Sequence, residues 1–291
     1  MYQNTEWKDY ELLDASDGER LERWGKYILI RPDPQVIWKG EKKHPKWQKA
    51  DASYRRQGGG GEWSEHKLPN EWDIRYGNLS FIIRPMGFKH TGLFPEQATN
   101  WDWMANLIRK ANRPIRVLNL FAYTGGATIA TASAGASVCH VDAAKGMVAY
   151  AKENAMKNHL GNAPIRYIVD DCRKFAEREI RRGNRYDAIV MDPPSYGRGP
   201  GGEVWKLEEC IDDFLRIAVD LLSDNPLFFL LNSYTTGLSA STMKYMASQR
   251  ILSKYNGNIE AEELGLPVSQ TKLYLPCGSS VRISFSQSEH E

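Results

Sequence analysis

Cysteines are few and widely spaced in this sequence of 291 residues. The four of them stand at positions 139, 172, 210 and 277, and no two form a C-x-x-C pair. A disulfide framework needs several closely spaced cysteines, and a structural zinc site needs paired ligands. The sequence therefore predicts scattered reduced thiols, no disulfide framework and no metal.

Long apolar runs are also absent. The longest, such as Leu227–Leu231, are far shorter than the roughly 20 residues that a membrane-spanning helix needs. The polar start from Met1 to Glu6 has no apolar segment of the kind found in signal peptides. We therefore expect a cytoplasmic protein without membrane contact.

An excess of charge of one sign is missing as well. Lysine and arginine together number 38, aspartate and glutamate 36, and the formal net charge is +2. The overall charge of the chain therefore cannot hold a nucleic acid, and any such partner must bind a local basic patch.

The strongest basic patch in the sequence runs from Arg31 to Arg56. It holds eight basic and three acidic residues, and Trp38, Trp47 and Tyr54 lie between them. Such a segment could bind an RNA backbone and stack bases, or it could be a solvated face beside half-buried aromatic residues. The sequence leaves both interpretations open.

Residues 1–95 have the pattern of a small β-rich domain. Short β-prone runs, such as Tyr27–Ile30 and Leu79–Ile83, are separated by proline, glycine and charged residues. We predict that this domain contacts the RNA or another substrate.

Residues 96–291 have the pattern of an α/β domain. Predicted buried strands cover 116–121, 137–142, 166–170, 186–192 and 227–234. Predicted helices cover 125–134, 145–159, 172–182, 204–223 and 240–254. This alternation indicates a doubly wound, mostly parallel sheet. Two further strands, 259–264 and 280–285, have no helix between them, which favours an antiparallel hairpin.

A glycine turn follows the first strand of this domain. The strand runs through Phe121, Tyr123 and Thr124 into Gly125, where a helix opens. Asp142 stands seventeen positions later, at the end of the second strand, where its carboxylate can accept both hydroxyls of a ribose. The pair predicts an adenosine-containing cofactor; an ordinary turn with a helix-capping aspartate is the alternative.

The fourth strand ends in the sequence Asp192-Pro193-Pro194-Ser195-Tyr196. Two prolines fix an extended turn and leave carbonyl groups free to accept from an amino group, while Tyr196 can stack on a planar ring. This arrangement indicates a clamp for the amine of a base. At the end of the third strand, Asp171 could bond an adenine amino group or cap the next helix.

Together, LNLFAYTGGAT (118–128), Asp142, DDC (170–172) and DPPSY (192–196) closely resemble class I S-adenosylmethionine-dependent methyltransferases, specifically the bacterial large-subunit (23S) ribosomal RNA methyltransferase group. The resemblance covers about residues 90–286. It implies a Rossmann-like sheet of seven strands whose last strand is antiparallel, S-adenosylmethionine as cofactor, and ribosomal RNA as partner.

The resemblance also implies roles for individual residues. Those that would line the methionine and ribose of the cofactor are Phe121, Tyr123, Thr124 and Gly125. Asp142 would hold the ribose hydroxyls and Asp171 the adenine, while Asp192 and Pro193 would form the methyl-transfer site. We count Asp192 among the cofactor-binding residues as well, and Tyr196 among the catalytic residues because its ring can stack on the base.

A segment like GxFxDQRxNR precedes the first strand in this group and helps to bind the cofactor. Here Phe94, Gln97 and Asn100 match it, glutamate replaces aspartate, and both arginines are missing. The match adds Phe94 and Gln97 to the cofactor site. We expect the β-rich domain to pack beside the cofactor, with Gln97 reaching into the site.

The acceptor atom follows from a missing cysteine. Methylation of cytosine C5 needs a cysteine that adds to the ring, and members of this group carry it after the fifth strand. Residues 231–235 read Leu-Asn-Ser-Tyr-Thr, so the sequence favours a base nitrogen as the methyl acceptor, with cytosine C5 as the alternative.

An NAD-dependent dehydrogenase and a non-catalytic RNA-binding module are the other classes of protein that fit parts of the sequence. Nothing predicts the nucleotide or the oligomeric state.

Overall fold

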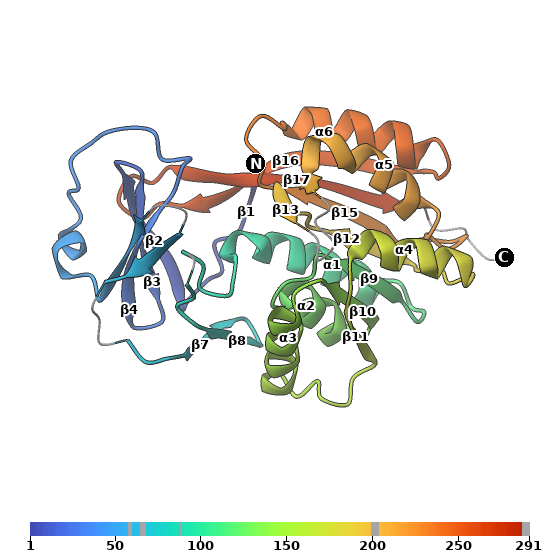
Figure 1. Ribbon diagram of the computed structural model, residues 1–291, viewed down its shortest axis with the longest axis horizontal. Helices are drawn as coiled ribbons and strands as arrows, with labels where there is room; N and C mark the ends of the chain where they lie inside the picture. The colour runs from blue at the N-terminus through green and yellow to red at the C-terminus, as the bar shows by residue number, and fades with distance from the viewer. Residues whose placement is uncertain (58–59, 65–67, 88, 199–203, 287–291) are drawn as a thin grey trace. The chain divides into compact units, whose positions relative to one another are not determined.

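The computed structural model describes residues 1–57, 60–64, 68–87, 89–198 and 204–286 (Figure 1). The chain divides into two compact units. Unit 1 comprises Met1–Thr99 and Leu264–Cys277, and unit 2 comprises Asn100–Glu263 and Gly278–Glu291. Unit 1 thus combines the N-terminal part of the chain with a segment close to its C-terminus.

Unit 2 is built on parallel strands that follow one another along the chain. They are β9 (Arg116–Leu120), β10 (Ser137–Asp142), β11 (Ile165–Val169), β12 (Ala188–Met191) and β15 (Phe228–Ser233). The order in the sheet is β1-β16-β17-β15-β12-β9-β10-β11. The chain therefore winds outward in one direction from β9 and in the other from β12. Ligands of open α/β sheets bind where the order reverses in this way.

Helices cover both sides of this sheet (Figure 1). On one side lie α2 (Gly126–Ser133) and α3 (Lys145–Lys157), and on the other α4 (Cys172–Arg181), α5 (Leu207–Val219) and α6 (Ala240–Ala247). Every residue of β12 and β15 is buried. A parallel strand that is covered on both faces has a continuous apolar sequence rather than an alternating one. These strands could therefore be predicted from the sequence.

The mostly parallel sheet with an antiparallel closing strand is confirmed. β17 (Tyr274–Phe285) runs antiparallel to β15, and its neighbour in the sheet is β16 (Gly257–Pro267). The sheet has eight strands rather than the predicted seven, because the short β1 (Tyr2–Gln3) pairs with Leu264 and Gly265 of β16.

Two local predictions in the second half of the chain need correction. Helix α1 (Ala98–Lys110) is not among the predicted elements. The predicted helix 204–223 begins only at Leu207, because β14 (Val204–Lys206) pairs with β13 (Tyr196–Arg198) as an antiparallel hairpin.

Unit 1 is mainly β-structure, in agreement with the predicted β-rich region. Five strands form one sheet: β2 (Tyr10–Ser16), β3 (Glu19–Trp24), β4 (Tyr27–Pro32), β5 (Ala52–Gln57) and β6 (Gly60–Trp63). A separate hairpin is formed by β7 (Trp72–Tyr76) and β8 (Leu79–Ile83). One face of the larger sheet packs Leu13, Leu21, Ile28 and Trp47 into an apolar cluster.

In the basic and aromatic segment 31–56, two of the three aromatic rings are buried, whereas most of the cations are exposed. Trp47 is buried and its Nε1 donates to Asp14 Oδ2 over 2.8 Å, while the buried Tyr54 donates its hydroxyl to the carbonyl of Gly87 over 3.1 Å. Arg31 is also buried. Base stacking by Trp47 and Tyr54 is therefore wrong, because both rings belong to the core. The exposed cations of the segment are Lys39, Lys42, Lys43, Lys49, Arg55 and Arg56.

Within the described ranges, no helix is long and apolar enough to cross a membrane.

Candidate functional site

The loop that follows β9 has an unusual backbone. Phe121 has φ 57°, Tyr123 has φ 50° and Gly125 has φ 88°. Positive φ is uncommon for residues other than glycine, and bulky side chains there are held by surrounding contacts, often at functional sites. Three alternate residues of one loop adopt it here.

Hydrogen bonds from the neighbouring strands hold this loop in place. Phe121 N lies 3.2 Å from Cys172 Sγ, and Ala122 N donates to the carbonyl of Val141 over 3.0 Å. Tyr123 N donates to Asp142 Oδ2 over 2.8 Å. The contacts come from β10 and from the start of α4, so the loop is fixed by the strand order itself.

Gly125 and Gly126 leave no room for a side chain. A Cβ on Gly125 would lie 3.0 Å from the Cβ of Ala151, and a Cβ on Gly126 would lie 2.9 Å from the ring of Trp101. Gly125 additionally needs its positive φ, which glycine adopts without steric cost. The turn therefore favours glycine at both positions where α2 begins.

Asp142 lies at the end of β10 and accepts two backbone hydrogen bonds. Oδ2 accepts from Tyr123 N and Oδ1 from Ala144 N, each over 2.8 Å. Burial raises the pKa of this carboxyl, while the hydrogen bonds from Ala144 and Tyr123 act in the opposite direction. Each carboxylate oxygen has a further lone pair, so the group can still accept two hydroxyl groups.

A buried polar network underlies the loop. Asn119 Nδ2 donates to Thr128 Oγ1 over 2.9 Å, and Thr128 Oγ1 lies 2.9 Å from His140 Nδ1. Because burial lowers the pKa of His140 to about 4, the imidazole is neutral at pH 7 and its Nδ1 can accept the Thr128 hydroxyl proton. Asn119 and His140 are not among the residues predicted from the sequence, although each is a polar residue within an otherwise apolar strand.

Asp171 is the N-cap of α4. Its Oδ1 accepts from Lys174 N over 2.8 Å, and the preceding Asp170 forms an ion pair with Arg178. The capping role left open by the sequence is therefore present. One carboxylate oxygen of Asp171 is left for a second role.

The segment after β12 forms a turn whose second proline carbonyl is occupied. Trp205 Nε1 donates to the carbonyl of Pro194 over 2.6 Å, so the expectation that both proline carbonyls are free is wrong for Pro194. Pro193 is buried and Asp192 half-buried, whereas the Tyr196 side chain is 53% exposed.

Trp205 also joins this turn to the strained loop. Its ring centroid lies 5.4 Å from that of Phe121 and 6.0 Å from that of Phe214. Trp205 falls within the predicted helix 204–223 and was therefore not predicted as a site residue. Its partner strand Tyr196–Arg198 is the part of the chain that puts it here.

Phe94 and Gln97 belong to unit 1. Phe94 precedes the short η2 helix (Pro95–Gln97) and lies 5.4 Å from the ring of His90, and Gln97 is buried. Their contact with the cofactor stays a prediction. In unit 2, Asn100 is fully buried and connects α1 to β17 through Ser280 and Arg282.

Among the residues that the structure describes, no group of three or more histidine, cysteine, aspartate or glutamate side chains could hold a metal ion.

A family model described as S-adenosylmethionine-dependent methyltransferase matches residues 34–223. The chain belongs to this family. This family assignment identifies the adenosine-containing cofactor as S-adenosylmethionine. The interpretation as an NAD-dependent dehydrogenase is therefore wrong. It also favours an enzyme over a non-catalytic binding module.

Solved structures support the fold of this methyltransferase. The crystal structure of an S-adenosylmethionine-dependent methyltransferase from Agrobacterium tumefaciens has a TM-score of 0.90 and 36% identity, covering 97% of this chain and 92% of that one. The protein SMU.776, solved in complex with SAH, has a TM-score of 0.72 and 20% identity, covering 97% of this chain and 76% of that one. The second likeness shows the fold alone.

Curated relatives match a part of the methyltransferase. The ribosomal RNA large subunit methyltransferase K/L of Shewanella baltica is 31% identical over 194 residues, which are 65% of this chain and 25% of the relative. The chain thus spans about a quarter of the length of such relatives.

Proposed function

We propose that this methyltransferase transfers a methyl group to a base nitrogen of RNA, with ribosomal RNA as the substrate. The similarity to ribosomal RNA large subunit methyltransferases supports the substrate class. The observation that carries the choice of atom is the turn Asp192-Pro193 at the reversal of strand order, together with the environment of the cysteines.

The residues at the ends of β9 and β10 suit the cofactor. Phe121, Tyr123, Thr124 and Gly125 would line its methionine and ribose, and Asp142 would accept the ribose hydroxyls. Two further contacts stay with the proposal, Asp171 to the adenine and the pair Phe94 and Gln97 from unit 1. The close approach that Gly125 and Gly126 permit and the fixed carboxylate of Asp142 support this assignment.

Asp192 and Pro193 would orient the acceptor base. The carboxylate of Asp192 and the carbonyl of Pro193 can accept hydrogen bonds from an amino group, which aims the nitrogen lone pair. The exposed ring of Tyr196 can stack on the base. Since the Pro194 carbonyl accepts from Trp205, the Pro193 carbonyl is the one assigned to the base.

S-adenosylmethionine supplies an activated methyl group, so a nitrogen acceptor needs positioning and exclusion of water rather than a protein nucleophile. Cytosine C5 would instead require a thiolate. Burial raises the pKa of Cys139 to about 11 and raises the pKa values of Cys172 and Cys277 as well. These three thiols are therefore unsuited to act as nucleophiles. Cys210 lies half-buried on α5.

Single-turnover methyl transfer to undermodified ribosomal RNA tests this proposal. Asp192→Ala should reduce the rate at least about a hundredfold, the order expected for losing an acceptor-positioning group. It should leave SAH affinity within about threefold of the wild type, a difference of well under 1 kcal/mol.

Cys210→Ser is the matched control for the choice of atom, and we expect it to remain active. An inactive Cys210→Ser enzyme, or a covalent adduct between the protein and RNA containing 5-fluorocytosine, would overturn the nitrogen acceptor and establish cytosine C5. Methylation of protein or small molecules in place of RNA would overturn the substrate.

A further inference from the structure

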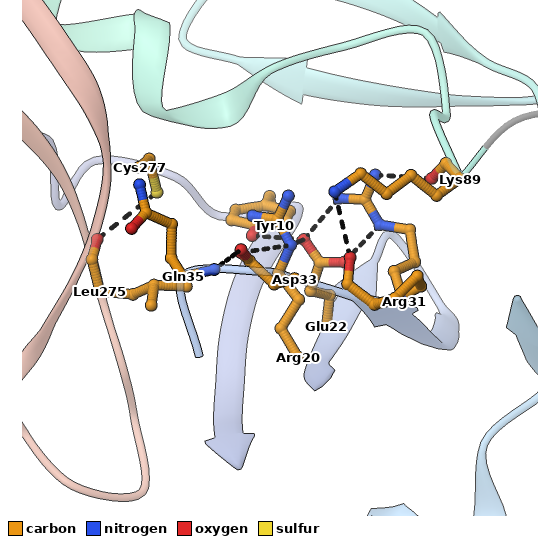
Figure 2. A network of polar contacts seen from close by, with 10 residues as sticks. Tyr10, Arg20, Glu22, Arg31, Asp33, Gln35, Lys89, Leu275 and Cys277 are labelled. Carbon is orange, nitrogen blue, oxygen red and sulfur yellow. Dashed lines mark hydrogen bonds and ion pairs between the residues drawn. The ribbon is translucent and has the colours of Figure 1, made fainter. Parts of the chain in front are cut away.

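Unit 1 buries a cluster of charged side chains on one face of β3 and β4 (Figure 2). Its members are Arg20, Glu22, Arg31 and Asp33, and all are less than a tenth exposed. We call them the buried charge cluster. Removing such charges from water costs several kcal/mol each, and native proteins compensate by pairing them and satisfying their hydrogen bonds.

Most of the cluster is well paired. Glu22 accepts from Arg31 Nε over 2.6 Å, from Arg31 Nη2 over 2.7 Å and from the hydroxyl of Tyr10 over 2.8 Å. Burial opposes ionisation of Glu22, but the charges of Arg31 and Arg20 and these hydrogen bonds lower its pKa to about 2. Asp33 accepts from Gln35 N over 2.9 Å.

Arg20 is the exception. Its Nε lies 3.5 Å from Asp33 Oδ2 and 3.7 Å from Glu22 Oε1, distances of ion pairs rather than good hydrogen bonds. Its buried Nε donates no hydrogen bond to any described residue, although only 8% of Arg20 is exposed. A guanidinium carries five N–H donors, and buried donors are normally satisfied. Arg20 is therefore ion-paired with Asp33 and Glu22, but its buried Nε has no hydrogen-bond acceptor among the described residues.

The surroundings indicate the charge of that partner. Lys89 is a third cation close to Arg20 and Arg31, and its Nζ donates to the carbonyl of Pro32 over 3.2 Å. Burial lowers the pKa of Lys89 to about 8 and that of His90 to about 4, and in both cases Arg20 and Arg31 add to the effect. With Lys89 protonated, three cations face two carboxylates. The cations of the cluster and Lys89 thus outnumber its carboxylates by one, which favours an anion, although, against the effect of burial, Glu22 and Asp33 raise the pKa of Arg20 itself.

We propose that the buried charge cluster is a phosphate-binding site in which Arg20 is the main ligand and Lys89 a second cation. Phosphate presents several acceptor oxygens to the planar donor fork of arginine, a pairing that combines charge with geometry. The phosphate can come from the backbone of an RNA or from a free phosphate compound. The site goes beyond the proposed function, because it requires no methyl transfer.

Binding of inorganic phosphate to the full chain provides the first test. Calorimetry should detect phosphate binding by the wild type, weakened roughly tenfold to a hundredfold in Arg20→Gln, as expected for losing charge-assisted hydrogen bonds. Arg20→Lys keeps the charge but not the fork and should be intermediate. Arg216→Gln removes an exposed arginine of α5 and should bind phosphate as the wild type does.

A second measurement needs no substitution. Phosphate bound beside Lys89 should raise its pKa and slow its acetylation, while acetylation of the exposed Lys157 should not change. Mass mapping of peptides gives both rates. If phosphate changes neither the calorimetric signal nor the acetylation of Lys89, the site does not bind phosphate and the proposal is overturned; equal binding by wild type and Arg20→Gln would also overturn it.

RNA binding separates the two sources of phosphate. If the RNA backbone occupies the site, Arg20→Gln should lower the slope of log affinity against log salt by about 0.7–0.9, the value for one lost phosphate contact. An unchanged slope with impaired phosphate binding supports the site and assigns it to a free phosphate compound. SAH affinity reports on the methyltransferase site independently, so failure of this proposal and failure of the proposed function are distinguishable.

Discussion

Replacing Asp142 by asparagine distinguishes two roles of this carboxylate: it holds the loop that follows β9, and it is proposed to bind the cofactor. Asparagine keeps one oxygen but turns the other into an NH₂ donor, which must face the backbone N–H of either Tyr123 or Ala144. One hydrogen bond to a charged acceptor is lost, at roughly 1.5–3 kcal/mol for a buried group. Because Asp142 is half-buried, we expect the lower end, about 1.5 kcal/mol of unfolding free energy.

The loss of cofactor affinity should exceed this structural effect. The ribose loses its charged acceptor as well as the fixed loop, so SAH should bind roughly tenfold to a hundredfold more weakly, where each factor of ten is about 1.4 kcal/mol. Urea unfolding measures the first quantity and calorimetry with SAH the second.

The matched control is Asp213→Asn, which changes an exposed carboxylate of α5 and should alter neither quantity. An Asp142→Asn protein that folds normally and binds SAH within about twofold of the wild type would refute the assignment of Asp142 to the cofactor site.

Three further predictions concern other parts of the molecule. Gly125→Ala should weaken SAH binding and lower the melting temperature more than Gly135→Ala does, because both have positive φ but only the first Cβ meets a neighbour, at 3.0 Å; calorimetry and thermal unfolding compare them. Glu22, whose pKa falls from 4.5 to about 2 on folding, should contribute about 3 kcal/mol above pH 4.5 that is lost as pH falls towards 2. Urea unfolding against pH should show this loss in the wild type and a smaller one in Glu22→Gln. Trp205→Phe removes the hydrogen bond to the Pro194 carbonyl and should lower the single-turnover rate about tenfold without changing SAH affinity.

The strands β12 and β15 of unit 2 were predictable because burial on both faces leaves a continuous apolar run. Ser137–Asp142 was predicted with the bounds that β10 has in the structure. The hairpin β13–β14 was not, because strand pairing between Tyr196–Arg198 and Val204–Lys206 is a tertiary preference that overrides the helical pattern of the residues that follow. Helix α1 was detectable: its buried residues Trp101, Met104, Ala105 and Ile108 have helical spacing.

The candidate site likewise contains residues that the sequence predicted and contacts that it could not predict. Asp142 and Asp192 stand at strand ends, a position that the linear pattern defines, and the structure places both there. The sequence could not show that Trp205 satisfies the Pro194 carbonyl, because that contact depends on the hairpin. Nor could it separate core from surface in the segment 31–56, where the hydrogen-bond partner of Trp47 is Asp14, distant in sequence on β2.

The membership of Leu264–Cys277 in unit 1 has a consequence for biosynthesis. During translation, Met1–Thr99 leaves the ribosome long before the strand segment to which β1 pairs, so unit 1 must wait for almost the whole chain before it can be completed. A nascent chain halted after Thr99 would present unpaired strand edges, which are prone to associate with other chains. Excising unit 1 by cutting the gene at residue 99 should therefore give an insoluble fragment, whereas a fusion that appends 264–277 through a linker restores its missing segment.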